Sequence, residues 1–270
     1  MQAATVRRPS VAGYFYPAGR GELTAALDQL APAHANGQQA MGLVLPHGSL
    51  RQAGKVLLSS VASIAVPDRC VLVGPSHVQT HQRWSLLRNG SYDTPLGEAP
   101  IDEVLAQSLL EQCPFLEEDR YGQAGEHSAE VPLVALQHRR RQTVSIVPVI
   151  ASQDDREEAR SLGKALAVAH ASRPFLLVAS VDCAQFVTQE AARRQAQAVA
   201  SALERLDPDE LAAVWNAEKI QPCGAAALEC LIAFAQTKGA TRTRLLAIGT
   251  SADEGGDPCS ATGYAGVAIH

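Results

Sequence analysis

The chain has 270 residues, of which 46% are hydrophobic and 19% charged, and its formal net charge is −5. This composition predicts a folded globular protein with a large core. The acidic balance offers no basic surface for nucleic acid or for an anionic membrane. The sequence contains neither a signal peptide nor an apolar stretch of the length that a membrane helix needs. We therefore expect a cytoplasmic protein with a single domain over residues 1–270.

Helical and extended patterns alternate from one end of the chain to the other. After an irregular segment rich in aromatic residues at 6–17, leucine spacing predicts a first helix, and a short apolar run then predicts the first strand. The expected helices cover residues 21–30, 55–64, 101–113, 129–136, 156–171, 189–206, 209–215 and 224–236. The expected strands cover residues 42–45, 69–73, 84–87, 143–150, 175–180, 244–249 and 262–269. This alternation predicts an α/β fold, a three-layer α/β/α sandwich with a mixed, mostly parallel central sheet.

Two histidines follow directly after predicted buried strands. His47 comes after Pro46 at the end of one apolar run, and His77 ends the sequence Gly-Pro-Ser-His after another. Open α/β sheets bind their ligands beside the carboxyl ends of the strands, where the loops diverge. These histidines are therefore candidate ligands or catalytic groups, although a single histidine in such a fold more often has a structural role.

Three further residues have comparable positions. Asp182 follows the strand at 175–180, and His127 lies at the entrance of a helix, where Ser128 is expected to be the N-cap. Cys223 precedes a helix, whose N-terminal dipole favours the thiolate, so that it could be a nucleophile or a ligand as well as a buried apolar residue. Imidazole, thiolate and carboxylate groups together suit Fe(II), Cu, Zn or Co. The spacing alone does not show that these residues meet.

The motifs, taken in order, resemble those of the Memo-like family, known in prokaryotes as AmmeMemoRadiSam system protein B. The matching pieces are RRPSVAGYFYP, LPHGSLRQAG, VGPSH, YDTPLGEAPID, EHSAEV, IVPVI, SVDCAQF, an isolated CG and TGYAG. The resemblance implies the fold of class III extradiol dioxygenases and a mononuclear metal pocket built from His47, His77 and Cys223. It also implies iron or copper as the cofactor, with zinc as a possible substitute, and Asp182 and His127 beside the metal.

The sequence departs from the family pattern at two places in the expected pocket. Gly48-Ser49-Leu50 stands where the family has Ala-Gly-Tyr, and Gln185 stands where the family has a histidine. Glutamine cannot shuttle a proton as imidazole does. If that position serves as an acid or base in the family, Gln185 would change the chemistry without touching the three metal ligands.

Three functions remain open from the sequence. The first is a metal-dependent redox or oxygenase-like enzyme with Asp182, His127 and Gln185 beside the metal. The second is a metal-binding or ligand-binding scaffold without catalysis, and the third is a metal-free thiol enzyme that uses Cys223 with His127. The resemblance further implies an unidentified small-molecule substrate and protein partners of the AmmeMemoRadiSam system.

Overall fold

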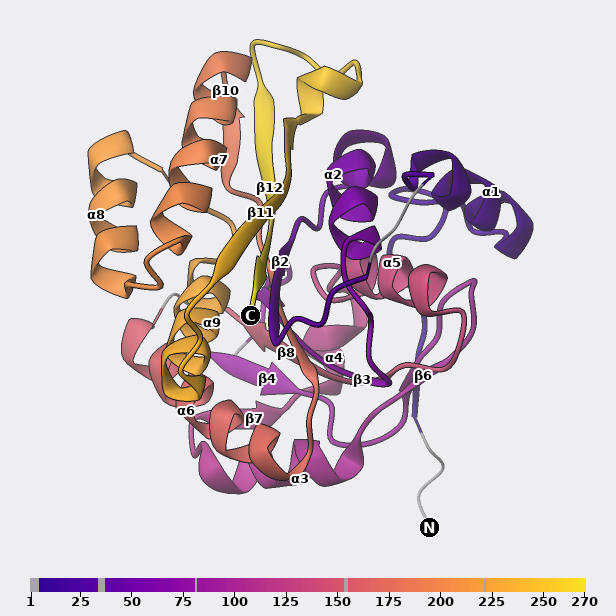
Figure 1. Cartoon of the computed structure of the whole chain (residues 1–270). Helices are drawn as coiled ribbons and strands as arrows, with labels where there is room; N and C mark the ends of the chain where they lie inside the picture. Colours follow the sequence, from indigo (N-terminus) through magenta and orange to yellow (C-terminus); the bar gives the residue numbers. More distant parts are fainter. Residues whose placement is uncertain (1–4, 34–36, 81, 153–154, 221) are drawn as a thin grey trace.

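The computed structural model describes residues 5–33, 37–80, 82–152, 155–220 and 222–270. These residues form a nine-stranded sheet with the strand order β10–β12–β2–β9–β3–β8–β4–β7, and β11 pairs with β12 as the ninth strand (Figure 1). The strands are β2 (Gly42–Leu45), β3 (Arg69–Pro75), β4 (Trp84–Leu86), β7 (Leu116–Glu118), β8 (Ser145–Ala151), β9 (Leu176–Ser180), β10 (Ala184–Val187), β11 (Thr243–Thr250) and β12 (Ala261–Ile269).

The centre of the sheet is parallel and buried. The neighbours β2, β9, β3 and β8 all run in one direction, and nearly every residue of these strands is buried. Their continuous apolar sequences fit this position, because both faces of a parallel sheet are covered by helices. The carboxyl ends of β2, β3 and β9 therefore meet at one edge, which is where the sequence places its polar residues.

Antiparallel pairs flank this centre. β12 pairs antiparallel with β2, β10 and β11 on one side, and β4 pairs antiparallel with β8 on the other. β8 is thus an inner strand, yet Pro148 lies one residue beyond the last pair with β4, Val149 with Leu86. The missing N–H of Pro148 is tolerated on the β4 side, since β4 does not pair with this residue.

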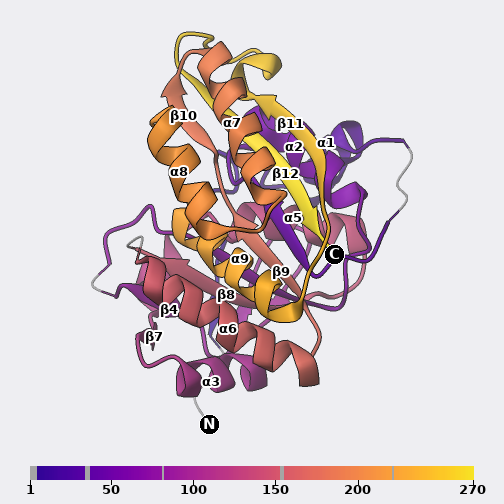
Figure 2. The same ribbon diagram turned by 60° about the vertical axis from the view of Figure 1, so that its left-hand side comes forward.

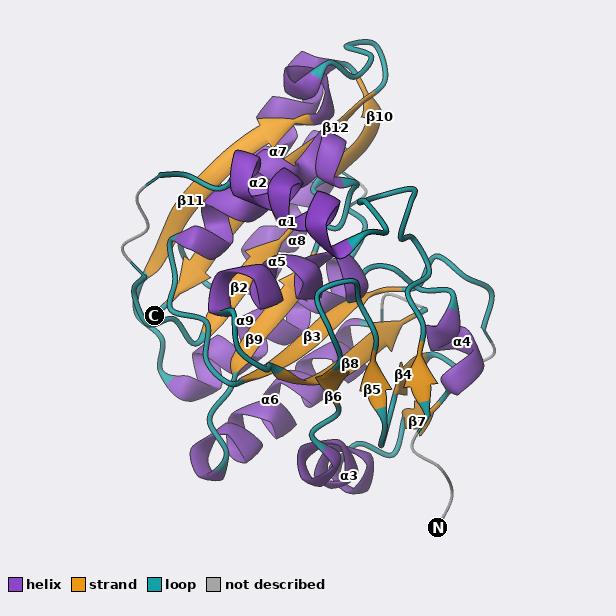
Figure 3. Cartoon of the chain, turned by 90° about the vertical axis from the view of Figure 1, so that its right-hand side faces the viewer, coloured by secondary structure: helices purple, strands orange, loops and turns teal. Residues whose placement is uncertain are grey.

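Helices cover both faces of the sheet and make the expected three layers. Figures 2 and 3 show these two faces, with α6 to α9 on one and α1, α2 and α5 on the other. The helices are α1 (Arg20–Leu30), α2 (Leu50–Ala62), α3 (Glu103–Gln112), α4 (Arg120–Ala124), α5 (Glu130–Arg140), α6 (Arg156–Ser172), α7 (Gln189–Leu203), α8 (Pro208–Glu218), α9 (Ala225–Lys238) and the 3-10 turn η1 (Ser251–Glu254). No helix in the described part of the chain is both long and apolar enough to cross a membrane.

The segment at 6–17, which we call the N-terminal strap, crosses the α5 side of the molecule. Its first residues form β1 (Val6–Arg7), which joins β5 (Ser91–Tyr92) and β6 (Ala99–Pro100) in a small second sheet. The remainder is a series of turns, as its glycine and proline content predicts. The buried Glu130 of α5 fixes the strap, because it accepts hydrogen bonds from several strap residues: Arg7, Ser10, Val11 and Tyr16.

Three local expectations were wrong. The helix expected over residues 55–64 begins earlier, at Leu50, because Leu50, Ala53 and Gly54 pack inward in the first turns of α2. Ser128 is not the N-cap of α5, since α5 begins at Glu130 and the Ser128 hydroxyl donates to the Pro75 carbonyl instead. The sequence pattern also failed to indicate the short elements β1, β5, β6, β7, β10 and α4.

Candidate metal centre

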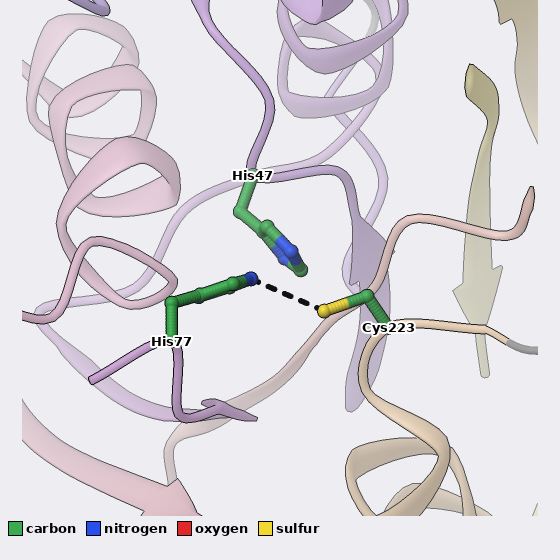
Figure 4. Close-up of side chains that lie close together, drawn as sticks. All are labelled: His47, His77 and Cys223. Carbon is green, nitrogen blue, oxygen red and sulfur yellow. Dashed lines mark hydrogen bonds between the residues drawn. The ribbon is translucent and has the colours of Figure 1, made fainter. Parts of the chain in front are cut away.

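The three residues implied as ligands come together at the carboxyl edge of the sheet. His47 follows β2, His77 follows β3, and Cys223 lies in the connection that leads into α9. One ligand atom from each, the two imidazole nitrogens and the sulfur, lies within 4.8 Å of the other two. In the close-up the side chains point toward one another, with 3.2 Å between His77 Nε2 and Cys223 Sγ (Figure 4). This spacing suits atoms that share one ion, since first-row metals bind N and S at roughly 2.0 to 2.3 Å.

His77 is oriented by the carboxylate of Glu126. The ring Nδ1 lies 2.9 Å from Glu126 Oε1, and the His77 main-chain N–H donates to Glu126 Oε2. The main-chain N–H groups of His127 and Ser128 donate to Glu126 as well, each at 2.7 Å. An ionised carboxylate only accepts hydrogen bonds, so the proton of the neutral His77 ring lies on Nδ1. Its Nε2 lone pair is thereby directed at Cys223.

His47 is buried, with 1% of its surface exposed, and its ring nitrogen Nδ1 bonds to a hydroxyl rather than to a carboxylate. Nδ1 lies 2.9 Å from Ser180 Oγ at the end of β9. The other ring nitrogen, Nε2, is buried and has no hydrogen-bond partner among the described residues. A buried polar atom without a partner is costly and calls for an explanation. His47 also belongs to the group of three residues whose ligand atoms lie within 4.8 Å of one another.

The surroundings determine the charges of these groups. Burial by itself raises the pKa of the Glu126 carboxyl, but the hydrogen bonds from His77 and Ser128 outweigh it and lower this pKa to about 2. Burial lowers the pKa of the His47 imidazole, against the opposing effect of Asp182. Burial and the neighbouring His77 lower the pKa of His127 to about 4. At neutral pH the pocket therefore contains an anionic Glu126 and neutral imidazoles at His47 and His127.

The main chain holds Cys223 against the sheet. Asp182 and Cys223 form an isolated antiparallel bridge in which the N–H of each donates to the carbonyl of the other, at 3.1 and 3.0 Å. Gly224 follows with φ +110°, and a Cβ atom there would approach the Ser180 carbonyl oxygen to 2.5 Å. Glycine alone fits this position, since both the backbone angle and the space exclude a side chain. The CG pair thus places the sulfur beside the ends of β2 and β3.

The residues predicted to lie beside the metal have three different settings. Asp182 accepts from the His47 main-chain N–H at 3.1 Å, and its other oxygen lies 3.8 Å from His47 Nε2. The His127 ring stacks on the His77 ring with 4.2 Å between centroids and contacts Phe15 of the strap at 4.7 Å. Gln185 is half-buried in β10 at an irregularity in the pairing with β12.

A second potential ligand group overlaps the first. His77, Glu126 and His127 also offer three atoms within 4.8 Å of one another. The Glu126 oxygens already accept four hydrogen bonds from this segment and His77, however. We therefore interpret this group as the support of the first one.

Sequence reasoning missed two of the groups that orient the ligands. Glu126 lies in the EHSAEV motif, but neither Glu126 nor Ser180 was among the expected site residues. A usable signal was present for Ser180, since it ends a buried strand two residues before Asp182. For Glu126 no local signal distinguishes it from Glu130, because both are acids at the start of the same helix.

Comparison with known proteins agrees with the family resemblance of the sequence motifs. The family model described as Memo-like protein matches residues 7–268. A MEMO1 family protein of Pyrobaculum aerophilum is 31% identical, with 98% of this chain and 99% of the relative aligned, and one of Thermoplasma acidophilum is 31% identical, with 96% and 97% aligned. The crystal structure of an uncharacterized protein from Escherichia coli K12 shares the fold with a TM-score of 0.57 at 17% identity, over 85% of this chain and 99% of that one. The chain belongs to the Memo-like family.

Proposed function

We propose that this protein binds one first-row transition-metal ion through His47 Nε2, His77 Nε2 and Cys223 Sγ and uses it in redox or oxygenase-like chemistry. The observation that carries the proposal is the convergence of these three atoms. Each imidazole has its Nδ1 engaged by another group, so that the Nε2 lone pairs remain for the ion. The buried Nε2 of His47 without a partner supports the same assignment.

The donor set narrows the choice of metal. Two imidazoles and a thiolate suit Fe(II), copper or zinc better than Mg²⁺ or Ca²⁺, which prefer oxygen ligands. Three protein ligands leave a coordination position open, as in catalytic rather than structural sites. We propose Fe(II) or copper as the physiological ion, with zinc as a substitute, because a redox role requires an ion that changes its oxidation state.

The neighbouring side chains would then have distinct tasks. The neutral His127 ring, stacked on His77, can accept a proton from a bound substrate. The Asp182 carboxylate, near His47 Nε2, can orient a hydrogen-bond donor of the substrate. Gln185, the position that departs from the family pattern, can donate or accept a hydrogen bond but cannot act as an acid or base as an imidazole would. When bound, the ion would supply the electron-transfer step.

Metal content tests the binding proposal directly. Protein purified without a histidine tag should contain close to one equivalent of metal, and His77→Ala and Cys223→Ala should each lose most of it. His138→Ala and Cys259→Ala are matched controls, since His138 binds Asp28 and Cys259 is exposed in the loop before β12. Equal metal content in all five proteins would refute the proposal.

A binding protein without catalysis is the second candidate, and Gln185 is the observation that favours it. Oxygen consumption by the Fe(II)-loaded protein with catechol-type substrates separates the two. Turnover above that of free Fe(II) supports an enzyme, and full metal occupancy without turnover of any tested diol supports the scaffold. A Gln185→His variant that gains turnover would identify this position as the cause.

A thiol enzyme built on Cys223 and His127 receives less support. The imidazole nitrogen within hydrogen-bond distance of the Cys223 sulfur belongs to His77. If alkylation of Cys223 abolished an activity that chelators do not affect, the result would support the thiol enzyme instead. For the cellular setting we propose the cytoplasm, a small-molecule substrate and partners from the AmmeMemoRadiSam system.

A further inference from the structure

The Ser180 hydroxyl lies between the His47 ring and a main-chain carbonyl. Ser180 Oγ is 2.6 Å from the Ser128 carbonyl oxygen and 2.9 Å from His47 Nδ1. A carbonyl oxygen can only accept, so the single hydroxyl proton is used in the bond to Ser128. Toward His47 the hydroxyl is then an acceptor, and the neutral ring must donate from Nδ1. A buried serine with both contacts fixed in this way determines where the imidazole proton lies.

A competing acceptor lies on the other side of the same ring. Asp182 Oδ2 is 3.8 Å from His47 Nε2. Hydrogen bonds to an ionised carboxylate are roughly twice as strong as those between neutral groups. Without Ser180, a small movement of the ring would let Nε2–H donate to Asp182. That tautomer has no lone pair on Nε2 and cannot bind a metal there.

On the basis of the proposed metal site, we infer that Ser180 is a positioning residue that keeps the His47 proton on Nδ1 and so preserves the Nε2 lone pair for the ion. The two histidines are thus oriented by different means. A carboxylate holds His77 at Nδ1, and a hydroxyl holds His47 at Nδ1, where the Asp182 carboxylate lies near the other ring nitrogen.

The two orienting groups are connected through Ser128. Its main-chain N–H donates to Glu126, and its carbonyl oxygen accepts from Ser180. Glu126 therefore supports His77 directly and His47 through one peptide unit and the Ser180 hydroxyl. The Ser128 side chain takes no part in this chain of bonds, because its hydroxyl donates to Pro75.

Long-range ¹H–¹⁵N correlation spectra of the metal-free protein, labelled at histidine nitrogen, test the inference without any metal. The spectra distinguish the Nδ1–H from the Nε2–H tautomer, and a His47→Gln variant assigns the signals. We expect Nδ1–H in the wild type, a shift of His47 toward Nε2–H in Ser180→Ala, and no shift in the control Ser60→Ala, a buried serine whose hydroxyl donates to the Val56 carbonyl within α2. In Ser180→Ala/Asp182→Asn the amide NH₂ can donate to Nε2, which should restore Nδ1–H.

The effect of these substitutions on the metal site is measured as the affinity for Co(II), by competition with a chelator. Loss of an orienting hydrogen bond on a ligating histidine costs 10–100-fold in metal affinity. We expect a loss of that size for Ser180→Ala and wild-type affinity for Ser60→Ala.

The possible results separate this inference from the proposed function. An Nε2–H tautomer of His47 in the wild type overturns the inference even if Ser180→Ala does not fold. So does an Nδ1–H tautomer retained in Ser180→Ala, or a tautomer shift with unchanged Co(II) affinity. Wild-type protein with the Nδ1–H tautomer and no Co(II) binding overturns the proposed function while supporting the placement of the proton.

Discussion

Two buried carboxylates, Glu126 and Glu130, lie four residues apart and have different tasks. Both are fully buried with 0% exposure. Glu130 pairs with the Arg7 guanidinium and also accepts from the Tyr16 hydroxyl and from the main-chain N–H groups of Ser10 and Val11. Glu126 receives main-chain N–H groups and one imidazole.

The difference shows how the same side chain can stabilise a fold or prepare a site. The Arg7 guanidinium compensates the negative charge of Glu130, and this ion pair fixes the N-terminal strap to α5. Around Glu126 the negative charge is shared with a ring whose other nitrogen points into the ligand group. A buried acid bonded to a histidine whose other ring nitrogen faces a further ligand-type side chain therefore indicates a functional site better than a buried acid bonded to arginine.

The largest expected effect lies in the strap. Glu130→Ala leaves the buried Arg7 without its partner, and breaking a buried ion pair in this way costs about 3–5 kcal/mol of unfolding free energy. Urea denaturation measures the loss. The neighbouring Arg8 is the control, because its side chain is 79% exposed and its pair with Asp93 should contribute about 0–1 kcal/mol.

A Glu130→Ala variant as stable as Arg8→Ala would contradict the structural role of Glu130. The folded Glu130→Ala protein should bind Co(II) with nearly wild-type affinity. A large loss of Co(II) affinity would show that the strap and the pocket are not separate in function.

The second effect lies in the pocket, where a substitution should lower metal affinity strongly and unfolding free energy less. Glu126→Gln should lower Co(II) affinity by about 10–100-fold, because the amide is a weaker acceptor for the His77 ring. Its cost in unfolding free energy, about 1–3 kcal/mol, should be smaller than that of Glu130→Ala. Chelator competition and urea denaturation on the same samples give both numbers. Unchanged Co(II) affinity would remove Glu126 from the site.

The pH dependence of the metal-free protein should follow the lowered pKa values. Folding lowers the pKa of Glu126 from 4.5 to about 2, so the unfolded chain binds more protons in that range. This contribution to stability is complete above pH 4.5 and is lost as the pH falls toward 2. His127, lowered from 6.5 to about 4, adds an earlier loss between those values. Urea titrations should show a shallower decline below pH 4.5 for Glu126→Gln than for the wild type.

The smallest effects concern two glycines. A Cβ atom on Gly74 would lie 2.6 Å from Ser128 Oγ and 3.3 Å from Ser180 Cβ, so Gly74→Ala should cost about 1–3 kcal/mol and weaken Co(II) binding. Gly21 in α1 has open space, and Gly21→Ala should stabilise the protein by about 0.5–1 kcal/mol. Thermal unfolding of both variants checks that Gly74→Ala lowers the stability and that Gly21→Ala raises it. A harmless Gly74→Ala would argue against tight packing around Ser180.

The long elements were predictable from the sequence, and the short ones were not. Apolar runs such as that of β3 identify a buried strand, and leucine spacing identified α1 within one residue. Two-residue and three-residue strands such as β5 and β7 contain too few residues for any periodicity to appear. β10 begins one residue after Cys183 and exists because it pairs with β12, a partner some 75 residues away in sequence.

For the site, the sequence could supply candidate residues but not their contacts. His47 and His77 stand out because both follow buried strands. The role of Ser180 depends on a carbonyl from another element, and the role of Glu126 depends on the loop after β3 folding back onto it. Such contacts join residues about 50 positions apart, which no local pattern records.

The antiparallel bridge with Asp182 holds Cys223 in place, and the position of Cys223 has a consequence for the unfolding of the protein. His77 and Cys223 are separated by 146 positions in sequence, so an ion held by both would join two distant parts of the chain only while the chain is folded. Metal bound only to the folded state raises the unfolding free energy with its concentration. Amide hydrogen exchange in the connection from α8 to α9 should therefore slow on metal loading. The pocket would then act as a reversible cross-link, and the lifetime of the folded state would increase with the concentration of available metal.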